Sequence, residues 1–311
     1  MIELPPRPME PVLWPDSFDD DDWAFQIKWD GMRLLTAAEA GGVRAFNRHG
    51  VDRTAWFPEV AGLPRQLLQA GAVLDGEAVA FLAGKPSFRR LMQRVRSRDP
   101  GRLRGEAPMS YMVFDLLALG DTDLRPLPWE ERQARLRKVL EPGGFVALVE
   151  TLPGAGRRLF QVAAQHDLEG IVAKRRDSPY VGGRTDLWRK VKYVKRRPFV
   201  IAGYRLRGGR LASLLLAAYD EAGRLTYVGN AGTGLDERTM EALHQVLKEN
   251  ALSLAPVITG WPRAPQGSRD AWVLPALTVL VEFLEWTEGG HLRAPVIRSL
   301  NPTTPAACRL D

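Results

Sequence analysis

The chain has 311 residues, of which 45% are hydrophobic, and its 43 Lys and Arg residues against 37 Asp and Glu residues give a formal net charge of +6. This is enough apolar material for two cores, so a mainly disordered chain is excluded. One cysteine, Cys308, and four histidines exclude a disulfide framework and a cysteine-based zinc finger, and disfavour a His-based metal cluster.

No export or membrane segment is predicted. The first twenty residues contain prolines and acids, where a secretory signal would have a basic start and an apolar run. The most apolar stretch, residues 272–286, contains Pro275 and Glu282 and is shorter than the roughly 20 residues that span a bilayer. We therefore expect a soluble, cytoplasmic protein that does not associate with membranes.

Alternation of apolar and polar residues predicts strands in the first two-thirds of the chain, over 25–29, 73–81, 111–119, 145–150, 170–176 and 188–193. Apolar residues at three- and four-residue spacing predict helices over 87–98, 128–140 and 157–167. Because strands and helices do not alternate regularly, the pattern predicts an α+β domain of antiparallel sheets with flanking helices. The acidic run at 19–22 is predicted to be an exposed turn.

The composition changes at residues 195–198, a charged segment that ends in proline. Strands are predicted after it over 198–206, 212–220, 225–232, 272–287 and 292–300, with one helix over 236–251. This content is typical of a small Greek-key β-barrel such as an OB-fold. We therefore predict two domains, residues 1–195 and 196–311.

Lysine and arginine are concentrated in two segments, residues 85–105 and 182–212, each of which contains a single acidic residue. One such segment would be interpreted as a solvated surface. Two of them favour a surface that follows a phosphate backbone, so binding to nucleic acid is predicted.

Lys28 lies in the segment FQIKWDGMR, on the opposite face of a predicted strand from Phe25, Ile27 and Trp29. The Asp-Gly pair that follows predicts a turn. A lysine at the end of a strand becomes a nucleophile when its surroundings favour the free amine. Taken alone, Lys28 would be interpreted as an ordinary surface lysine.

Four further motifs follow Lys28, namely LDGEAVAF (74–81), VFDLLAL (113–119), EGIVAKR (169–175) and WRKVKY (188–193). In this order and spacing, the five motifs resemble those of the covalent nucleotidyltransferases, and most closely those of the ATP-dependent DNA ligases of the bacterial end-joining (LigD) type. The resemblance continues in the segments 227–237, 272–287 and 292–296, which look like the OB-domain of that family. It implies an adenylation (nucleotidyltransferase) domain over 1–195 and an OB-fold domain over 196–311.

The resemblance implies that Lys28 attacks the α-phosphate of ATP, expels pyrophosphate and carries AMP. The AMP would pass to the 5′-phosphate of a nick, and the 3′-hydroxyl would displace it and seal the DNA. Lys190 and Lys192 alternate along one strand, so both are expected to face the phosphate and to disfavour protonation of Lys28.

The same resemblance assigns the remaining site residues. Glu77 and Glu169 would lie near Mg²⁺ or Mn²⁺, which needs few protein carboxylates, and Glu77 also near the ribose. Adenine is expected to stack on Phe114 and to be enclosed by Ile27 and Val172. Phosphate or DNA contacts are expected from the basic residues Arg33, Arg48, Lys174, Arg293 and Arg298.

Two residues depart from the family pattern. Gln26 stands two residues before the lysine, where many members have Glu; an amide still accepts a hydrogen bond from the adenine amino group, but without a charge. Asn301 stands where a final basic residue is often found, which weakens the role expected of the second domain in the first step.

Three alternatives are open. An RNA ligase or an mRNA-capping guanylyltransferase would share the lysine motif, and a non-catalytic nucleic-acid-binding protein would share the basic segments. The motifs of the second domain favour a DNA ligase over the first two, and the intact set of site residues disfavours the third. The implied partners are nicked or broken duplex DNA and, in bacterial end joining, the end-binding protein Ku. Excision repair is equally compatible, and a monomer is expected.

Overall fold

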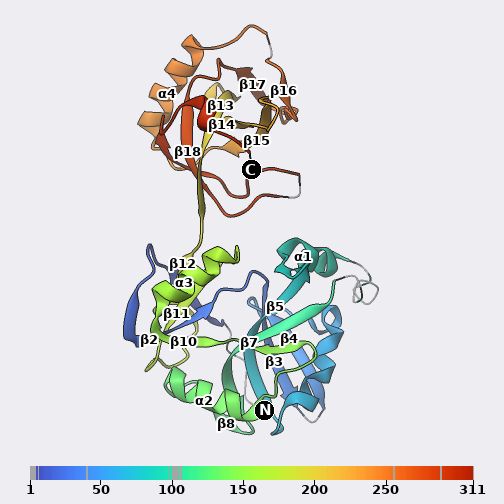
Figure 1. The fold of residues 1–311 in the computed structure, drawn as a ribbon. Coiled ribbons are helices and arrows are strands. Elements are labelled where there is room, and N and C mark those ends of the chain that lie inside the picture. Colours follow the sequence, from blue (N-terminus) through green and yellow to red (C-terminus); the bar gives the residue numbers. More distant parts are fainter. Residues whose placement is uncertain are drawn as a thin grey trace. The chain divides into compact units, whose positions relative to one another are not determined.

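A computed structural model describes the chain except residues 1–4, 6, 40, 98, 100–104, 106, 255, 288 and 311. The chain divides into two compact units, Met1–Tyr193 and Val194–Asp311, and the predicted domain boundary lies next to this division (Figure 1). Arg98, Arg102 and Arg104 of the first basic segment lie outside the described residues. Within the described part of the chain, no helix is both long and apolar enough to cross a membrane.

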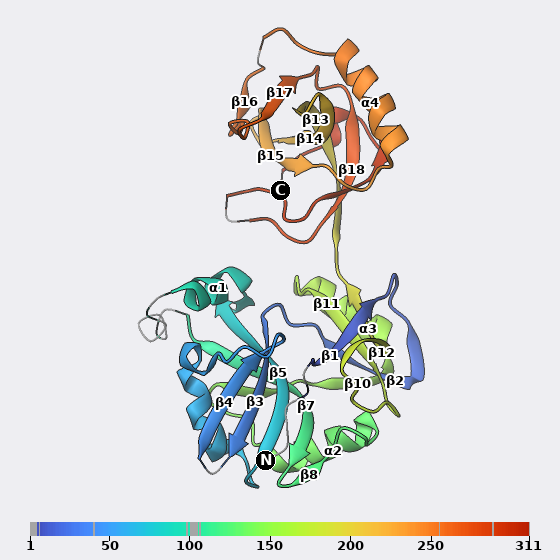
Figure 2. The same cartoon turned by 180° about the vertical axis from the view of Figure 1, so that it is seen from behind.

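The first unit contains two sheets with helices around them, seen from opposite sides in Figures 1 and 2. The sheet that we call sheet A has the order β1-β12-β11-β2-β10. Its strands are β1 (Met9–Leu13), β2 (Asp19–Ile27), β10 (Thr151–Ala155), β11 (Gly170–Arg175) and β12 (Gly183–Lys192). Sheet B has the order β4-β3-β5-β7-β8, with β6 paired to β5 and β9 paired to β7. Its strands are β3 (Met32–Glu39), β4 (Gly42–Asn47), β5 (Ala72–Leu82), β6 (Lys85–Pro86), β7 (Met109–Leu119), β8 (Thr122–Asp123) and β9 (Val146–Leu148).

The helices of this unit pack against the sheets. They are η1 (Thr54–Trp56), η2 (Pro58–Gln66), α1 (Phe88–Arg96), α2 (Trp129–Val139) and α3 (Gly156–Gln165). The Ser87 side chain accepts a hydrogen bond from the backbone N–H of Arg90 and so begins α1. On α2, the fully buried Arg132 makes two hydrogen bonds of 2.9 Å to Asp115 on β7. This pair attaches α2 to sheet B.

The second unit is one sheet of seven strands in the order β16-β15-β14-β13-β18-β19, with β17 also paired to β13. Its elements are β13 (Lys195–Arg207), β14 (Arg210–Tyr219), β15 (Leu225–Ala231), α4 (Glu237–Glu249), β16 (Ile258–Thr259), β17 (Ser268–Trp272), β18 (Thr278–Phe283), β19 (Val296–Leu300) and η4 (Pro305–Ala307). Leu243 and Leu247 of α4 join Phe199, Ile201 and Val281 in the core of this sheet.

The predicted α+β class and all four predicted helices are confirmed, with slightly different ends. Three details of the prediction are wrong. The acidic run at 19–22 is the exposed start of β2 rather than a turn, because its backbone pairs with β10. The strand expected over 272–287 is divided between β17 and β18 by a loop. The pairing is mainly antiparallel, but β1 with β12, β7 with β9 and β15 with β16 are parallel.

The buried pair on α2 gives a stability prediction. Asp115→Ala would leave the Arg132 guanidinium buried without its carboxylate, so we expect a loss of about 3–5 kcal/mol in the free energy of unfolding. Urea unfolding followed by circular dichroism measures it. The control is Asp123→Ala, which removes the surface partner of Arg125 and should cost about 1 kcal/mol or less. Equal losses in the two variants would contradict this role for Asp115.

Candidate active site

The register of sheet A places the predicted nucleophile beside the predicted phosphate-binding lysines. Val172 on β11 pairs with Gln26 on β2 and with Lys190 on β12, and residues directly opposite one another share a face of a sheet. Lys28 and Lys192 follow two residues after Gln26 and Lys190, so they lie on the same face. The backbone N–H of Lys28 donates to the Gly170 carbonyl over 2.9 Å, which continues the pairing past the end of β2.

Two glycines allow this close arrangement of backbones. A side chain at Gly31 would overlap the carbonyl oxygen of Ala78 on β5, and a side chain at Gly170 would overlap that of Val191 on β12. Gly170 also has φ of +135°, which L-residues rarely adopt. These two glycines therefore allow the backbone near Lys28 to lie close to β5 of sheet B and to β12 of sheet A.

A cavity of about 420 Å³ lies in the first unit beside Lys28. Nine of the residues predicted from the sequence line it, namely Ile27, Lys28, Arg33, Arg48, Glu77, Phe114, Val172, Lys174 and Lys190. The cavity therefore brings together residues from five separate sequence motifs. Residues that were not predicted also line it, including Trp29, Met32, His49, Phe88, Met92 and Trp188.

One end of the site is rich in charge. Glu169 forms ion pairs with Lys28 and, at 3.4 Å, with Lys192. Burial lowers the pKa of Lys190, and the neighbouring cations Lys28 and Lys192 lower it further. Burial raises the pKa of Glu77 to about 8, although Lys28 and Arg33 oppose the shift. The lysines in this part of the site outnumber the glutamates, so it is suited to bind a negatively charged ligand.

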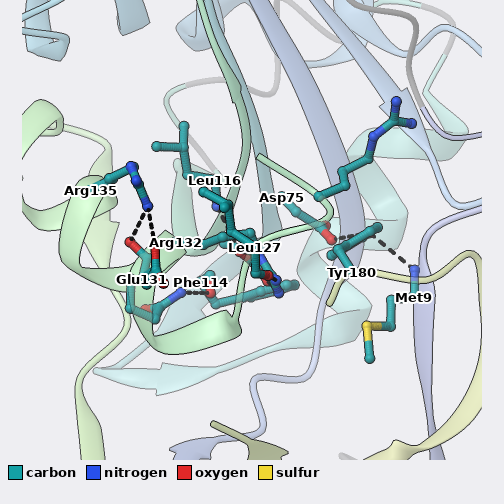
Figure 3. Close-up of polar contacts among 12 residues, drawn as sticks. Met9, Asp75, Phe114, Leu116, Leu127, Glu131, Arg132, Arg135 and Tyr180 are labelled. Atoms are coloured by element: carbon teal, nitrogen blue, oxygen red, sulfur yellow. Dashed lines mark hydrogen bonds and ion pairs between the residues drawn. The ribbon is translucent and has the colours of Figure 1, made fainter. Parts of the chain in front are cut away.

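The other end is aromatic. Phe114 and Trp188 meet edge to face with ring centroids 6.1 Å apart. The ammonium of Lys174 lies 4.2 Å from the Phe114 centroid and 4.0 Å from that of Trp188, and it donates to the Phe114 carbonyl over 3.3 Å. That carbonyl also accepts from Gln133 of α2 over 2.7 Å (Figure 3). Lys174, expected to face phosphate, thus lies against the predicted base-stacking ring.

Arg33 is held by a buried network that the sequence did not reveal. Its guanidinium pairs with both oxygens of Asp75, donates to the Met9 carbonyl over 3.0 Å and lies 4.6 Å from the Phe114 centroid. The Tyr180 hydroxyl donates to Asp75 over 2.6 Å and accepts from the Met9 N–H over 3.0 Å (Figure 3). Burial and the Asp75 charge raise the pKa of Tyr180 well above its ordinary value. Arg33, expected to contact phosphate, is bound to protein acceptors in this structure.

The two candidate metal ligands, Glu77 and Glu169, both lie near Lys28. Glu77 lines the cavity and Glu169 contacts Lys28 at its charged end. Within the described ranges there is no group of three or more His, Cys, Asp or Glu residues that could enclose an ion. Two carboxylates suit Mg²⁺, which keeps water and phosphate oxygens in its coordination shell.

The arginines predicted to contact DNA lie in different parts of the structure. Arg48 lies at the cavity, where its Nε donates to His49 over 3.1 Å. Arg293 and Arg298 belong to the second unit and pair there with Glu285 and Glu282. They do not line the cavity described here.

Asn301 has a structural role. It has φ of +49°, and its side chain accepts from the Thr278 N–H over 3.2 Å, while its own N–H donates to the Thr278 carbonyl over 2.6 Å. Asparagine tolerates this conformation better than most residues, so Asn301 suits this position of the loop.

Several arginines of the two basic segments contact other side chains of the protein and are therefore not available to bind nucleic acid. Arg94 is fully buried and pairs with Glu59, and Arg205 pairs with Asp270. Arg189 lies between two tryptophans, 3.9 Å from the Trp14 ring centroid and 4.3 Å from that of Trp23. The predicted phosphate-following surface therefore contains fewer residues than the sequence count suggests.

Comparison with known proteins identifies two family models along the chain. Residues 15–192 match the ATP dependent DNA ligase domain, and residues 207–303 match the ATP dependent DNA ligase C terminal region. The chain is 36% identical over 289 residues to the multifunctional non-homologous end joining DNA repair protein LigD of Mycobacterium tuberculosis, which covers 90% of this chain and 36% of LigD. It is 33% identical to LigD of Pseudomonas aeruginosa, covering 98% of this chain and 35% of that protein. The chain thus spans about a third of these relatives.

Solved structures of LigD ligases are similar to this chain along almost its whole length. The ligase domain of M. tuberculosis LigD is 32% identical, with a TM-score of 0.56 and coverage of 98% of each chain. A mycobacterial DNA ligase D complexed with ATP and MES is 33% identical, with the same TM-score and coverage. These matches confirm the predicted order of an adenylation domain followed by an OB-fold domain.

The buried ammonium of Lys174 gives a pH prediction. Burial lowers its pKa from 10.5 to about 7, so between these pH values the unfolded chain binds a proton that the folded protein does not. The stability of the wild type relative to Lys174→Met should therefore rise with pH above about 7, by up to about 1.4 kcal/mol per pH unit. Urea unfolding across this range measures the slope. Lys85→Met, at a surface lysine, should show no such slope, and a flat difference for Lys174→Met would contradict the prediction.

Proposed function

The chain belongs to the ATP-dependent DNA ligase family, and we propose that it seals 5′-phosphate/3′-hydroxyl breaks in duplex DNA through AMP bound covalently to Lys28. The observation that carries the proposal is that one cavity is lined by Lys28, which belongs to a cluster of charged side chains, and by the aromatic side chains of Phe114 and Trp188. A purine nucleotide has the same two chemical ends, a polyanion and a flat base.

The aromatic end supports binding of the base. Phe114 offers a ring for stacking, and Val172 lines the same cavity. Ile27 also lies at the cavity, but its side chain packs against the core on the other face of sheet A. The cations Lys174 and Arg33 and the α2 residue Gln133 hold the Phe114 ring or its carbonyl. A fixed ring loses little conformational entropy when it binds the base.

The charged end supports the chemistry. The free amine of Lys28 would attack the α-phosphorus, the new bond would join Nζ to phosphorus, and the bond to pyrophosphate would break. An ammonium has no lone pair for attack, so the amine of Lys28 has to separate from Glu169 and lose its proton to water before it attacks. Lys190 and Lys192, on the same face, would balance the phosphate charge as it changes, which is the main contribution that proteins make to phosphoryl-type transfer.

Glu77 and Glu169 are the residues that would hold Mg²⁺ or Mn²⁺. When bound, the ion would neutralise phosphate charge beside Lys28. Their oxygen donors suit Mg²⁺, whose remaining ligands would come from water and the nucleotide.

The proposed steps on DNA are supported mainly by the similarity to the LigD relatives, and less by the cavity. We propose that Arg48, at the cavity, and Arg293 and Arg298, in the second unit, contact DNA phosphates. The relatives are named as end-joining proteins, so repair of broken ends, with Ku as a partner, is proposed for this chain. Its monomeric state and cytoplasmic location stay predictions.

Covalent labelling tests the first step. The protein is treated with pyrophosphate to remove any bound AMP and then incubated with Mg²⁺ and α-labelled ATP or GTP. We expect acid-labile label from ATP on the denatured wild type and on Lys85→Ala, and none on Lys28→Ala, since Lys85 is a surface lysine and Lys28 the acceptor. The adenylated protein should then seal nicked DNA.

The other results would overturn parts of the proposal. Label from GTP alone would indicate a capping-type enzyme, and sealing of nicked RNA without nicked DNA would indicate an RNA ligase. Label that persists in Lys28→Ala, or no label from either nucleotide, would contradict the assignment of Lys28.

A further inference from the structure

Tyr180 lies in the segment between β11 and β12, outside the motifs that identify the family, and it is 5% exposed. Its backbone N–H donates to the Arg125 carbonyl over 2.8 Å. Its ring meets Trp188 edge to face, with the ring centroids 5.9 Å apart. Contacts of both the backbone and the ring therefore hold the hydroxyl of this tyrosine in place.

The hydroxyl completes a closed set of hydrogen bonds under Arg33. It accepts from the Met9 N–H over 3.0 Å and donates to Asp75 Oδ2 over 2.6 Å (Figure 3). Arg33 Nη2 donates to the same Asp75 oxygen over 2.6 Å and to the Met9 carbonyl over 3.0 Å. A backbone N–H only donates, and a carboxylate paired with arginine only accepts, so the direction of each bond is fixed.

These bonds join the two sheets of the first unit. Arg33 on β3 and Asp75 on β5 belong to sheet B, whereas Met9 lies on β1 of sheet A and Tyr180 connects two strands of sheet A. Met9 and Asp75 are fully buried, so bulk water does not replace a partner that is lost from the set. The cavity is lined by residues of both sheets, and the hydroxyl thus helps to fix Arg33 relative to sheet A.

Arg33 keeps one nitrogen for a ligand. Its Nε and Nη2 are used by Asp75 and Met9, whereas its Nη1 has no hydrogen-bond acceptor among the residues that the structure describes. The side chain is 14% exposed and lines the cavity, with the guanidinium carbon 4.6 Å from the Phe114 ring centroid. Because the guanidinium is planar, bonds at Nε and Nη2 also fix the direction of the Nη1 donors.

We propose that Tyr180 is a positioning residue for nucleotide binding, whose hydroxyl holds Met9 and Asp75 so that Arg33 presents Nη1 to an acceptor atom of ATP. The proposal rests on the proposed function, since it takes ATP to be the ligand of the cavity. Tyr180 does not line this cavity, so it acts through Arg33 and not by contact with the nucleotide.

The effect of losing the hydroxyl follows from the closed set of bonds. Tyr180→Phe keeps the ring, but it leaves the buried N–H of Met9 without its acceptor and removes one donor from Asp75. A buried polar group without a partner is costly, so both residues are expected to shift and to hold Arg33 less firmly. A less fixed side chain loses more conformational freedom when a ligand binds to it. Binding of ATP should therefore weaken.

The test measures KM and kcat for formation of lysyl-AMP by the full chain, after pyrophosphate treatment and with α-labelled ATP. We expect Tyr180→Phe to raise KM about three- to tenfold, the range that corresponds to one hydrogen bond. Because Arg33 lies beside Phe114 at the aromatic end, kcat should stay within about twofold of the wild type.

Tyr111→Phe is the matched control. It also removes a buried hydroxyl from the first unit, but this hydroxyl contacts the Leu34 carbonyl and Thr36 and makes no hydrogen bond with Arg33, Asp75 or Met9. The KM for ATP of this variant should therefore equal that of the wild type.

A double-mutant cycle separates positioning of Arg33 from general damage to the sheets. Arg33→Lys keeps a cation for Asp75 but lacks the second terminal nitrogen that is left for the nucleotide. In this background Tyr180→Phe should change KM by less than about twofold, whereas a general loosening would raise KM equally in both backgrounds. If thermal melting shows that Arg33→Lys does not fold, Arg33→Gln replaces it with the same expectation.

Three results would overturn the proposal. They are an unchanged KM in Tyr180→Phe, an equal rise of KM with Arg33 and with the substituted residue, and a rise of the same size in Tyr111→Phe. Failure of the proposed function itself looks different, because the wild type would then form no lysyl-AMP from ATP.

Discussion

The alternation of side chains along strands and the register of β2, β11 and β12 together constrain the whole site. They put Lys28, Lys190 and Lys192, which come from distant parts of the sequence, on one face of sheet A. A slip of β2 or of β12 by one residue against β11 would turn the lysines of that strand to the other face, where Phe25, Ile171 and Val191 form a core. The packing of that core therefore fixes the position of the nucleophile, and Gly170 allows the strands to approach closely enough.

Charged side chains are arranged differently in the interior of the first unit and beside the cavity. Deep in the first unit, acids and arginines form fully satisfied pairs, such as Arg132 with Asp115 and Arg33 with Asp75. Beside the cavity, by contrast, Lys28 and Lys192 share the carboxylate of Glu169, and burial shifts the pKa values of Lys190 and Glu77. The buried arginine–aspartate pairs fix the structure around the cavity. The charged residues beside Lys28 are suited to bind a polyanion together with a divalent ion.

Much of this arrangement could be predicted from the sequence. Short motifs identified Lys28, Glu77, Phe114 and Lys190, because the chemistry requires particular residue types, and period-2 alternation gave the faces of several strands. The contacts between motifs could not be predicted. Asp75 and Tyr180 lie 105 residues apart, and no local pattern indicates that they meet under Arg33. Lys174 was placed with phosphate contacts for its charge alone, since its aromatic surroundings come from three different elements. The run at 19–22 was misread because strand pairing overrides the turn preference of aspartate.

If one cavity holds both the base and the α-phosphate of ATP beside Lys28, a crystal structure of the ATP-treated protein should show both of them there. We expect electron density continuous from Lys28 Nζ to phosphorus, with the adenine against Phe114 and its 6-amino group facing Gln26. AMP attached to another lysine, or a base bound outside the cavity lined by Phe114 and Val172, would show that this cavity does not carry out the first step.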